Sequence, residues 1–297
     1  MLEAFLESKA VKRRWGAEQR LEFIEFRLFW EGGVNRSDLT SHFGVSVPQA
    51  SNDLSDYKEL AGSNLRYDAS EKRYVATQDF KPLFLKPGAS RYLNQLKAIA
   101  DGIIDREETL IENMPEVDSM QIPRRHTDPK ALRGLLEAIR QQASVEVRYQ
   151  SMGADRTEPI WRRITPHAFG HDGFRWHVRA FCHLDGKFKD FIVSRCARVR
   201  DFGEAGAAAD DDVHWQMFFD VVLRPNPSLS DSQQRTIALD YEMKNGRAEL
   251  PIRYALLYYF EKRLRLDVAA QKDRPSETPV IVENWTEFVT ARDAAMA

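Results

Sequence analysis

The stretch FRWHVRAF, residues 174–181, alternates apolar and cationic side chains with a period of two residues. On a β-strand this period places Arg175, His177 and Arg179 along one face, which can hold an anion. A solvated outer face of an antiparallel sheet explains the same alternation, so the strand alone leaves both interpretations open. Trp176 has the opposite parity, which it shares with two apolar residues, and is expected to lie in the core.

The composition indicates a chain of several domains. With 297 residues, of which 43% are hydrophobic and 30% charged, the chain is long enough for two or three domains. The longest apolar stretch, near Tyr254, is far shorter than a membrane span, and no apolar signal-peptide region follows the basic N-terminal residues. Cys182 and Cys196 alone do not make a disulfide framework, so we expect a reducing cytoplasm and no membrane.

The formal net charge of −2 is unevenly distributed. Residues 130–200 contain 14 Lys or Arg against 7 Asp or Glu, together with four of the seven histidines. A cationic excess of this size in one segment favours an anionic partner, such as a molecule that carries phosphate.

Residues 17–75 follow the order helix, helix, turn, helix and β-hairpin, which is the order of a winged helix. Asn35 is a typical cap for the short second helix, and Gly44 makes the turn after it. Ser46 and Gln49 have the spacing of a capping box at the start of the third helix. We therefore expect a helix-turn-helix in this segment.

The third helix is expected to bury Ala50, Leu54 and Tyr57 and to turn its polar residues toward the major groove of DNA. Gln and Asn can pair with adenine edges, whereas the basic residues of the helix and hairpin suit phosphates. The predicted DNA-binding residues are Pro48, Gln49, Ser51, Asn52, Ser55, Lys58, Arg66, Lys72 and Arg73. Asp53, Asp56 and Glu59 of this helix would have to point away from the duplex. A module that binds protein is the alternative, since residues 1–77 contain 11 basic and 12 acidic residues.

Beyond the winged helix the pattern predicts an α+β chain. A helix over residues 92–104 has a narrow apolar seam that suits a partner helix, and Asp128-Pro129 starts another helix. Four or five short strands between residues 145 and 195 favour a small antiparallel barrel. The Gly-, Ala- and Asp-rich residues 203–212 are expected to form a linker. The tail, 218–266, predicts strand, helix, strand and helix.

Trp176 and the residues around it resemble the WYL domain, although His177 and Val178 depart from the Trp-Tyr-Leu triplet. The pattern that matches includes Tyr149-x-Ser151, Pro166-His167-Ala168, the segment 179–182 and the segment 190–195. Over its full length the chain resembles WYL transcriptional regulators of the BrxR/CapW type, which act as homodimeric repressors of anti-phage defence operons. The resemblance implies four parts. These are a winged helix-turn-helix domain at 1–86, a helical linker and dimerisation segment at 87–127, a WYL domain with an Sm-like small β-barrel at 128–203, and a C-terminal α+β dimerisation domain at 213–297.

The resemblance also implies a ligand pocket in the WYL domain. Carried over by position, it would use Tyr149, Ser151, His167, His177, Arg179 and Arg195, and the same strand face adds Arg175 and Phe181. Arg offers a planar fork for phosphate, His a further donor, and aromatic rings a stacking face for a base. The expected ligand is a nucleotide or a short nucleic acid.

No sequence motif indicates catalysis or a bound metal or cofactor. The chain has no Gly-rich phosphate loop, nucleophile elbow or His-Glu-x-x-His pair, and its histidines and cysteines lack the paired spacing of a metal site. We expect a ligand-responsive regulator that binds a palindromic double-stranded operator as a homodimer. An RNA-binding accessory protein, and a metal-independent nuclease or phosphodiesterase, are the alternatives.

Overall fold

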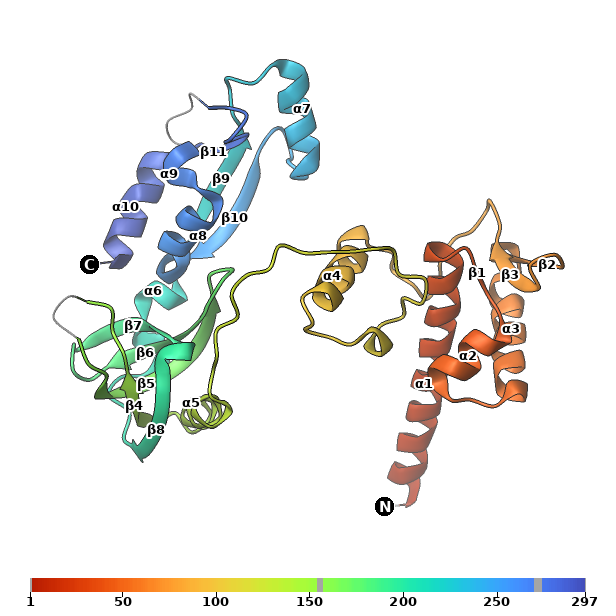
Figure 1. Cartoon of the computed structure of the whole chain (residues 1–297), viewed down its shortest axis with the longest axis horizontal. Coiled ribbons are helices and arrows are strands. Elements are labelled where there is room, and N and C mark those ends of the chain that lie inside the picture. Colours follow the sequence, from red (N-terminus) through yellow and green to blue (C-terminus); the bar gives the residue numbers. More distant parts are fainter. Residues whose placement is uncertain (1, 154–156, 270–273, 297) are drawn as a thin grey trace. The chain divides into compact units, whose positions relative to one another are not determined.

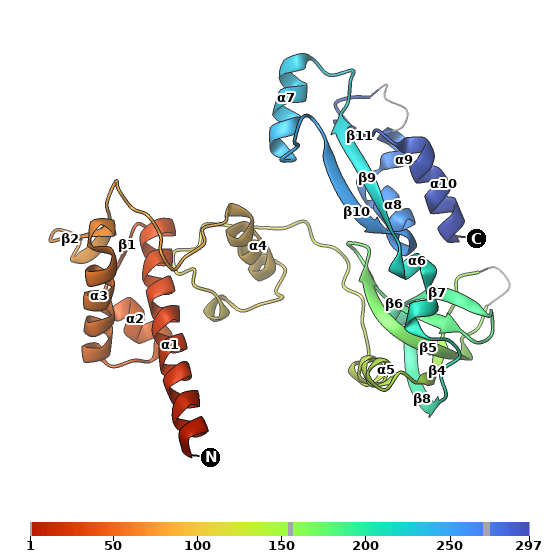
Figure 2. The same cartoon turned by 180° about the vertical axis from the view of Figure 1, so that it is seen from behind.

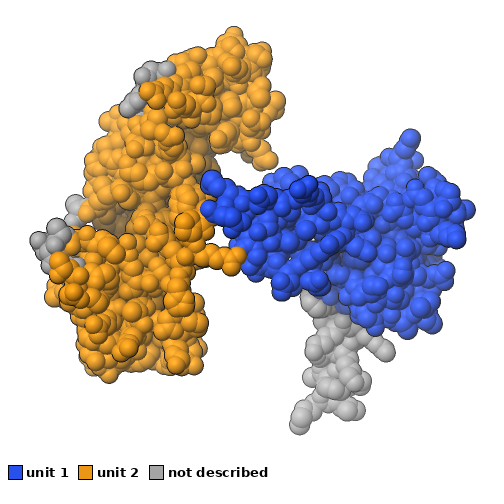
Figure 3. All heavy atoms as spheres, in the orientation of Figure 1, with its two compact units in different colours: residues 1–121 blue, residues 122–297 orange. Residues whose placement is uncertain are grey.

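The computed structural model describes residues 2–153, 157–269 and 274–296, with side chains except those of residues 2–15 and 269. The chain divides into two compact units, residues 1–121 and residues 122–297, which are coloured separately in Figure 3. No helix of the described residues is both long enough and apolar enough to cross a bilayer.

The first unit has the order of elements that its sequence predicts. These elements are α1 (Leu2–Trp30), β1 (Gly33–Val34), α2 (Arg36–Phe43), α3 (Val47–Ala61), β2 (Leu65–Asp68), β3 (Arg73–Ala76) and α4 (Ala89–Ala100). Strands β2 and β3 form the hairpin, and β1 adds a third strand on the far side of β3. The winged-helix arrangement is thereby confirmed (Figure 1).

Local capping explains where the two central helices begin. The Asn35 side chain accepts a hydrogen bond from the Asp38 N–H, and the Asp38 carboxylate accepts one from the Asn35 N–H. Gly44 ends α2 in the left-handed conformation, with φ of 64°. Ser46 caps α3 as predicted, but the Gln49 side chain does not return to it and instead donates to Asp53.

The predicted apolar seam over residues 92–104 is only partly available to a partner. Helix α4 ends at Ala100, and its Leu96 is buried in the same cluster as Phe26. Tyr92 stacks on Trp30 of α1, with the ring centroids 4.8 Å apart. Leu93 and Ile103 remain exposed. Half of the seam therefore packs within the unit.

A single buried carboxylate holds the segment after the wing against the helices. Glu25 is fully buried in α1, and its Oε1 accepts hydrogen bonds from the Tyr57 hydroxyl (3.0 Å) and the Leu83 N–H (2.8 Å). Its Oε2 accepts from the N–H groups of Phe84 and Leu85, each at 2.7 Å. Four donors therefore compensate the carboxylate for the water it loses on burial.

The second unit begins with a helix packed on one face of a five-stranded antiparallel sheet. Its elements are α5 (Pro129–Gln141), β4 (Ser144–Tyr149), β5 (Ile160–His171), β6 (Trp176–Cys182), β7 (Lys187–Ile192) and β8 (Cys196–Gly203). Leu135 and Ala138 of α5 are buried in one cluster with Val147, Ile164 and Val178 of the sheet. The order is β7-β6-β5-β4-β8, and no described residues pair the edge strands with each other. The sheet is open, so the expected closure into a barrel is not observed.

The C-terminal part of this unit is a smaller α+β domain. It contains α6 (Val213–Gln216), β9 (Phe218–Pro225), α7 (Asp231–Asp240), β10 (Ala248–Arg253), α8 (Leu257–Leu264), α9 (Leu266–Ala269), β11 (Val280–Val282) and α10 (Trp285–Met296). Helices α8, α9 and α10 lie along one side of strands β9 and β10 (Figure 2). The predicted strand, helix, strand and helix are confirmed, and β11 and α10 follow them.

The expected core position of Trp176 is wrong. Its side chain is 58% exposed, whereas Val178, two residues further on the same face, is completely buried. Trp176 is the first residue of β6 and lies beside His171, with ring centroids 4.7 Å apart. On this face of the strand the packed core begins only at Val178. Sharing its parity with Val178 therefore does not bury Trp176, at the start of the strand.

We predict that Glu25→Gln lowers the free energy of unfolding of the winged-helix unit by about 2–4 kcal/mol. The substituted amide has only one acceptor oxygen, and its NH₂ group would face backbone donors. Calorimetry of the full chain measures the transition. Glu22→Gln on the same helix is the control, since its carboxylate meets only Arg91, at 3.9 Å. Equal losses in the two variants would contradict the assigned role of Glu25.

Candidate functional site

Helix α3 has a buried face and an exposed polar face, as its sequence predicts. Ala50, Leu54 and Tyr57 belong to the core of the winged helix. On the opposite side the predicted DNA-binding residues are available to solvent. Pro48, Asn52, Ser55 and Lys58 are exposed, and Gln49 and Ser51 are partly exposed. This division is what a helix inserted in the major groove requires.

The acidic residue in the middle of α3 faces the protein. Asp53 is buried, and its carboxylate accepts two hydrogen bonds from Arg20 of α1, Nε at 2.6 Å and Nη2 at 3.0 Å. The Gln49 amide also donates to it, at 3.0 Å. Asp53 is therefore turned into the protein, and one donor of Gln49 is already engaged by it, whereas Asp56 and Glu59 of the same helix are exposed.

The wing places its three predicted basic residues around the hairpin. Arg66 and Lys72 are exposed, and Lys72 has a left-handed backbone with φ of 52°. Arg66 pairs with Asp68 at 3.2 Å and Arg73 with Glu71 at 2.7 Å. Surface pairs of this kind contribute little to stability, so a phosphate can replace the carboxylate as partner.

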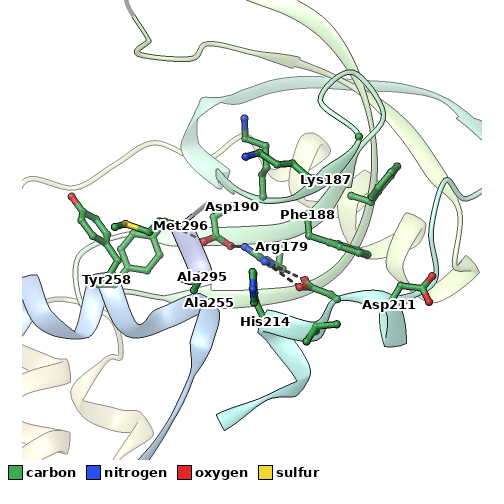
Figure 4. A pocket seen from close by; sticks show the side chains of 16 residues that line it. Arg179, Lys187, Phe188, Asp190, Asp211, His214, Ala255, Tyr258, Ala295 and Met296 are labelled. Carbon is green, nitrogen blue, oxygen red and sulfur yellow. Dashed lines mark hydrogen bonds and ion pairs between the residues drawn. The ribbon is translucent and has the colours of Figure 1, made fainter. Parts of the chain in front are cut away.

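In the second unit, the cationic face of β6 is buried and paired with carboxylates. Arg179 is 5% exposed and donates to Asp212 through Nε at 2.7 Å and Nη2 at 3.1 Å. Its Nη1 donates to Asp190 of β7 at 3.4 Å. His167 Nε2 lies 2.9 Å from the same Asp212 carboxylate. Figure 4 shows Arg179 between the strand with Asp190 and the segment that precedes α6.

A second carboxylate, that of Asp172, contacts the other two side chains of the face, Arg175 and His177. His177 is 2% exposed, and its Nε2 lies 2.9 Å from Asp172 Oδ2, to which Arg175 Nε also donates at 2.8 Å. The ring of Tyr259 from α8 lies 4.6 Å from the His177 ring. The Tyr259 hydroxyl donates to Asp190 at 3.2 Å. Helix α8 thus covers this part of the sheet.

These environments shift the acids in opposite directions. Burial favours a higher pKa for Asp212, but hydrogen bonds from His167 and Arg179 outweigh it and lower the pKa to about 2. Burial raises the pKa of Asp190, with Arg179 acting against it. At neutral pH, Asp212 is therefore firmly ionised.

A cavity of about 1060 Å³ opens beside Arg179, between the sheet and the C-terminal domain. This volume is large enough for a nucleotide or a short oligonucleotide. Its wall combines ring-bearing and charged residues. They include Phe181, Phe188, Tyr258, Tyr259, Arg179, Lys187, Lys189, Asp190, Asp211 and Asp212 (Figure 4). Of the eight predicted ligand residues, Arg179 and Phe181 line this cavity. His167 does not line it but contacts Asp212, which does.

The remaining predicted residues lie elsewhere. The Tyr149 ring is buried and meets Phe191 edge to face at 5.0 Å, and its hydroxyl accepts a hydrogen bond from the Ile192 N–H. Burial raises the pKa of Tyr149, while Arg195 beside it acts in the opposite direction. Ser151 is partly buried in the loop after β4. None of these three lines the cavity, and neither do Arg175 and His177, the other two of the eight.

The sequence interpretation missed three residues that complete the site. Asp190 and Tyr259 carry no local motif for this role, and Asp212 lies in the segment that was expected to be a linker. Most of this segment is exposed, but it is anchored to the sheet, because Asp212 is 1% exposed and the Gly206 N–H donates to Thr165 at 2.9 Å. The sequence offered one signal for Asp212, since Asp is a typical N-cap residue. Its side chain caps the short helix α6 and accepts a hydrogen bond from the Trp215 N–H.

No group of three His, Cys, Asp or Glu among the described residues could hold a metal ion. Cys182 and Cys196 are buried and unpaired, and burial raises the pKa of the Cys196 thiol to about 12. Neither is suited to act as a nucleophile.

Three family models match the chain in sequence order. They are the BrxR transcriptional regulator winged helix-turn-helix domain at residues 16–98, the WYL domain at 130–201, and the BrxR transcriptional regulator C-terminal dimerization domain at 218–288. Two of the three models describe domains of a transcriptional regulator, which agrees with the expectation that the chain is not an enzyme.

Curated relatives match over nearly the whole length. The DNA-binding transcriptional repressor CapW of Stenotrophomonas maltophilia is 41% identical over 94% of this chain and 93% of that protein. CapW proteins of Escherichia coli strain KTE188 and Pseudomonas aeruginosa are each 38% identical over 93% of this chain and 91% of the relative. The solved proteasome accessory factor B/C (PafBC) of Arthrobacter aurescens aligns at 17% identity with a TM-score of 0.28, over 93% of this chain and 45% of its own. By its three matched domains and these full-length relatives, the chain belongs to the BrxR/CapW family of winged-helix WYL transcriptional regulators.

Proposed function

We propose that this chain is a cytoplasmic, homodimeric transcriptional repressor that binds a palindromic operator of an anti-phage defence operon. The observation that carries the proposal is the exposed polar face of α3 beside the basic wing, on a core that buries Asp53. Relatives named DNA-binding transcriptional repressor CapW cover nearly the whole chain and support the same role. The match to a C-terminal dimerization domain supports a dimer, whose two-fold symmetry would require a palindromic site.

The second part of the proposal is that the cavity beside Arg179 takes a nucleotide or a short nucleic acid and thereby changes DNA affinity. The cavity has a size and a combination of aromatic and cationic residues that suit such a ligand. To regulate, the ligand must bind the DNA-competent and DNA-incompetent states with different affinities. RNA binding remains the alternative function. Gel shifts with DNA and with RNA distinguish the two functions.

We predict that Asn52→Ala weakens binding to the selected operator about 10- to 100-fold, because a bidentate contact to a base is lost. Lys58→Ala weakens binding to all sequences and reduces the salt slope by about one. Gel shifts on DNA selected from a random pool measure both effects. Lys244→Ala, an exposed lysine of the C-terminal domain, is the control. Unchanged operator affinity in Asn52→Ala, or tighter binding of RNA of the same sequence, would contradict this role of α3.

We predict that Tyr258→Ala reduces affinity for a fluorescein-labelled thymidine tetranucleotide about 10-fold, because a stacking surface on the cavity wall is lost. Fluorescence anisotropy gives the affinity. Tyr241→Ala is the matched control, since Tyr241 is similarly exposed but does not line the cavity. Equal affinity in the two variants would remove the cavity as the ligand site. Recovery of the tetranucleotide uncut separates binding from the nuclease alternative.

A further inference from the structure

The Asp212 carboxylate occupies the point at which the donors of the ligand site converge. Its Oδ2 receives Arg179 Nε at 2.7 Å and His167 Nε2 at 2.9 Å. Its Oδ1 receives Arg179 Nη2 at 3.1 Å and the Trp215 N–H at 3.2 Å. A planar guanidinium fork, an imidazole and a backbone N–H are also the kinds of donor that bind phosphates in proteins.

Asp212 belongs to the segment that joins the sheet to the C-terminal domain. It immediately precedes α6, whose Trp215 ring lies 5.9 Å from the His167 ring. The Arg253 guanidinium of β10 lies over the same Trp215 ring, 4.8 Å from the ring centroid. A backbone hydrogen bond also joins the residue after α6 to the residue after β10, since the Tyr254 N–H donates to the Met217 carbonyl at 3.1 Å. The contacts of Asp212 therefore fix the start of the C-terminal domain on strands β5 and β6.

The charges on the cavity wall favour an exchange at this position. With Asp212 in place, the carboxylates of Asp190, Asp211 and Asp212 balance the charges of one arginine and two lysines. If Asp212 moves into water, a cationic excess remains at the wall, next to the rings of Phe181 and Phe188. Arg179 would be left with one carboxylate partner, so an incoming anion would restore its pairing.

We propose that Asp212 is an internal substitute for the phosphate of the ligand, and that a nucleotide phosphate displaces it from Arg179 and His167. The displaced carboxylate is hydrated, and α6 loses its attachment to the sheet. The C-terminal domain is then held on the sheet by the contacts of α8 with Asp190 and His177, and it can change its orientation about them. This inference rests on the proposed ligand site, and it supplies the two states that regulation needs.

The test compares Asp212→Asn with Asp211→Asn, which removes the same charge from an exposed neighbour on the same wall. The probes are adenosine 5′-monophosphate and the thymidine tetranucleotide, which distinguish a terminal phosphate from a phosphodiester. We expect Asp212→Asn to bind one of them at least 10-fold more tightly than the unmodified chain, and Asp211→Asn to bind within about twofold of it. An equal gain in both variants would indicate charge alone and would overturn the exchange.

Hydrogen exchange of the unmodified chain needs no substitution and covers the case in which a variant fails to fold. Saturation with the bound probe should raise the exchange rates of the amides of residues 213–217, and Asp212→Asn should raise them without probe. If the probe binds but these rates do not change, the proposed displacement of Asp212 is wrong, whereas the ligand site is supported. If neither probe binds any form of the chain, the ligand site and the exchange both fail.

Discussion

The buried ion pair between Arg179 and Asp212 is the interaction on which the arrangement of residues 122–297 depends. Both side chains are almost inaccessible to water, and moving a charged group out of water costs several kcal/mol per ion. Four donors to one carboxylate offset this cost, so removal of either partner would leave an uncompensated charge and cost about 3–5 kcal/mol. A well-packed apolar pair could stabilise the joint as well. The use of ions at this point therefore favours a role in ligand exchange over a role in stability alone.

The two units show the same principle, a buried acid that fixes a segment distant in sequence, but with different consequences. Glu25 receives backbone N–H groups of residues 83–85 and is itself fully buried. Asp212 instead faces a cavity large enough for a nucleotide. The first contact stabilises the winged helix, whereas the second lies on the wall of that cavity.

Local patterns predicted the winged helix well because the interactions that define it are local. Asn35, Gly44 and Ser46 act within one helical turn, and the stripe of Ala50, Leu54 and Tyr57 follows helical spacing. The candidate ligand site is completed by contacts between residues far apart in sequence, Arg179 with Asp212 (33 positions) and Asp190 with Tyr259 (69 positions), and local spacing does not encode these. For the same reason, a Gly- and Ala-rich segment that resembled a linker holds a fully buried acid. The sequence pattern identified Arg179 and His167 but not the carboxylate that joins them.

The most direct measurement of the central claim is the sequencing of nucleic acid recovered with the protein from cells. A repressor of the proposed kind yields double-stranded DNA fragments that share one palindrome, located upstream of a defence operon, and the amount recovered changes when the regulating ligand accumulates. Recovery of RNA instead, or of DNA without a shared site, would contradict the account.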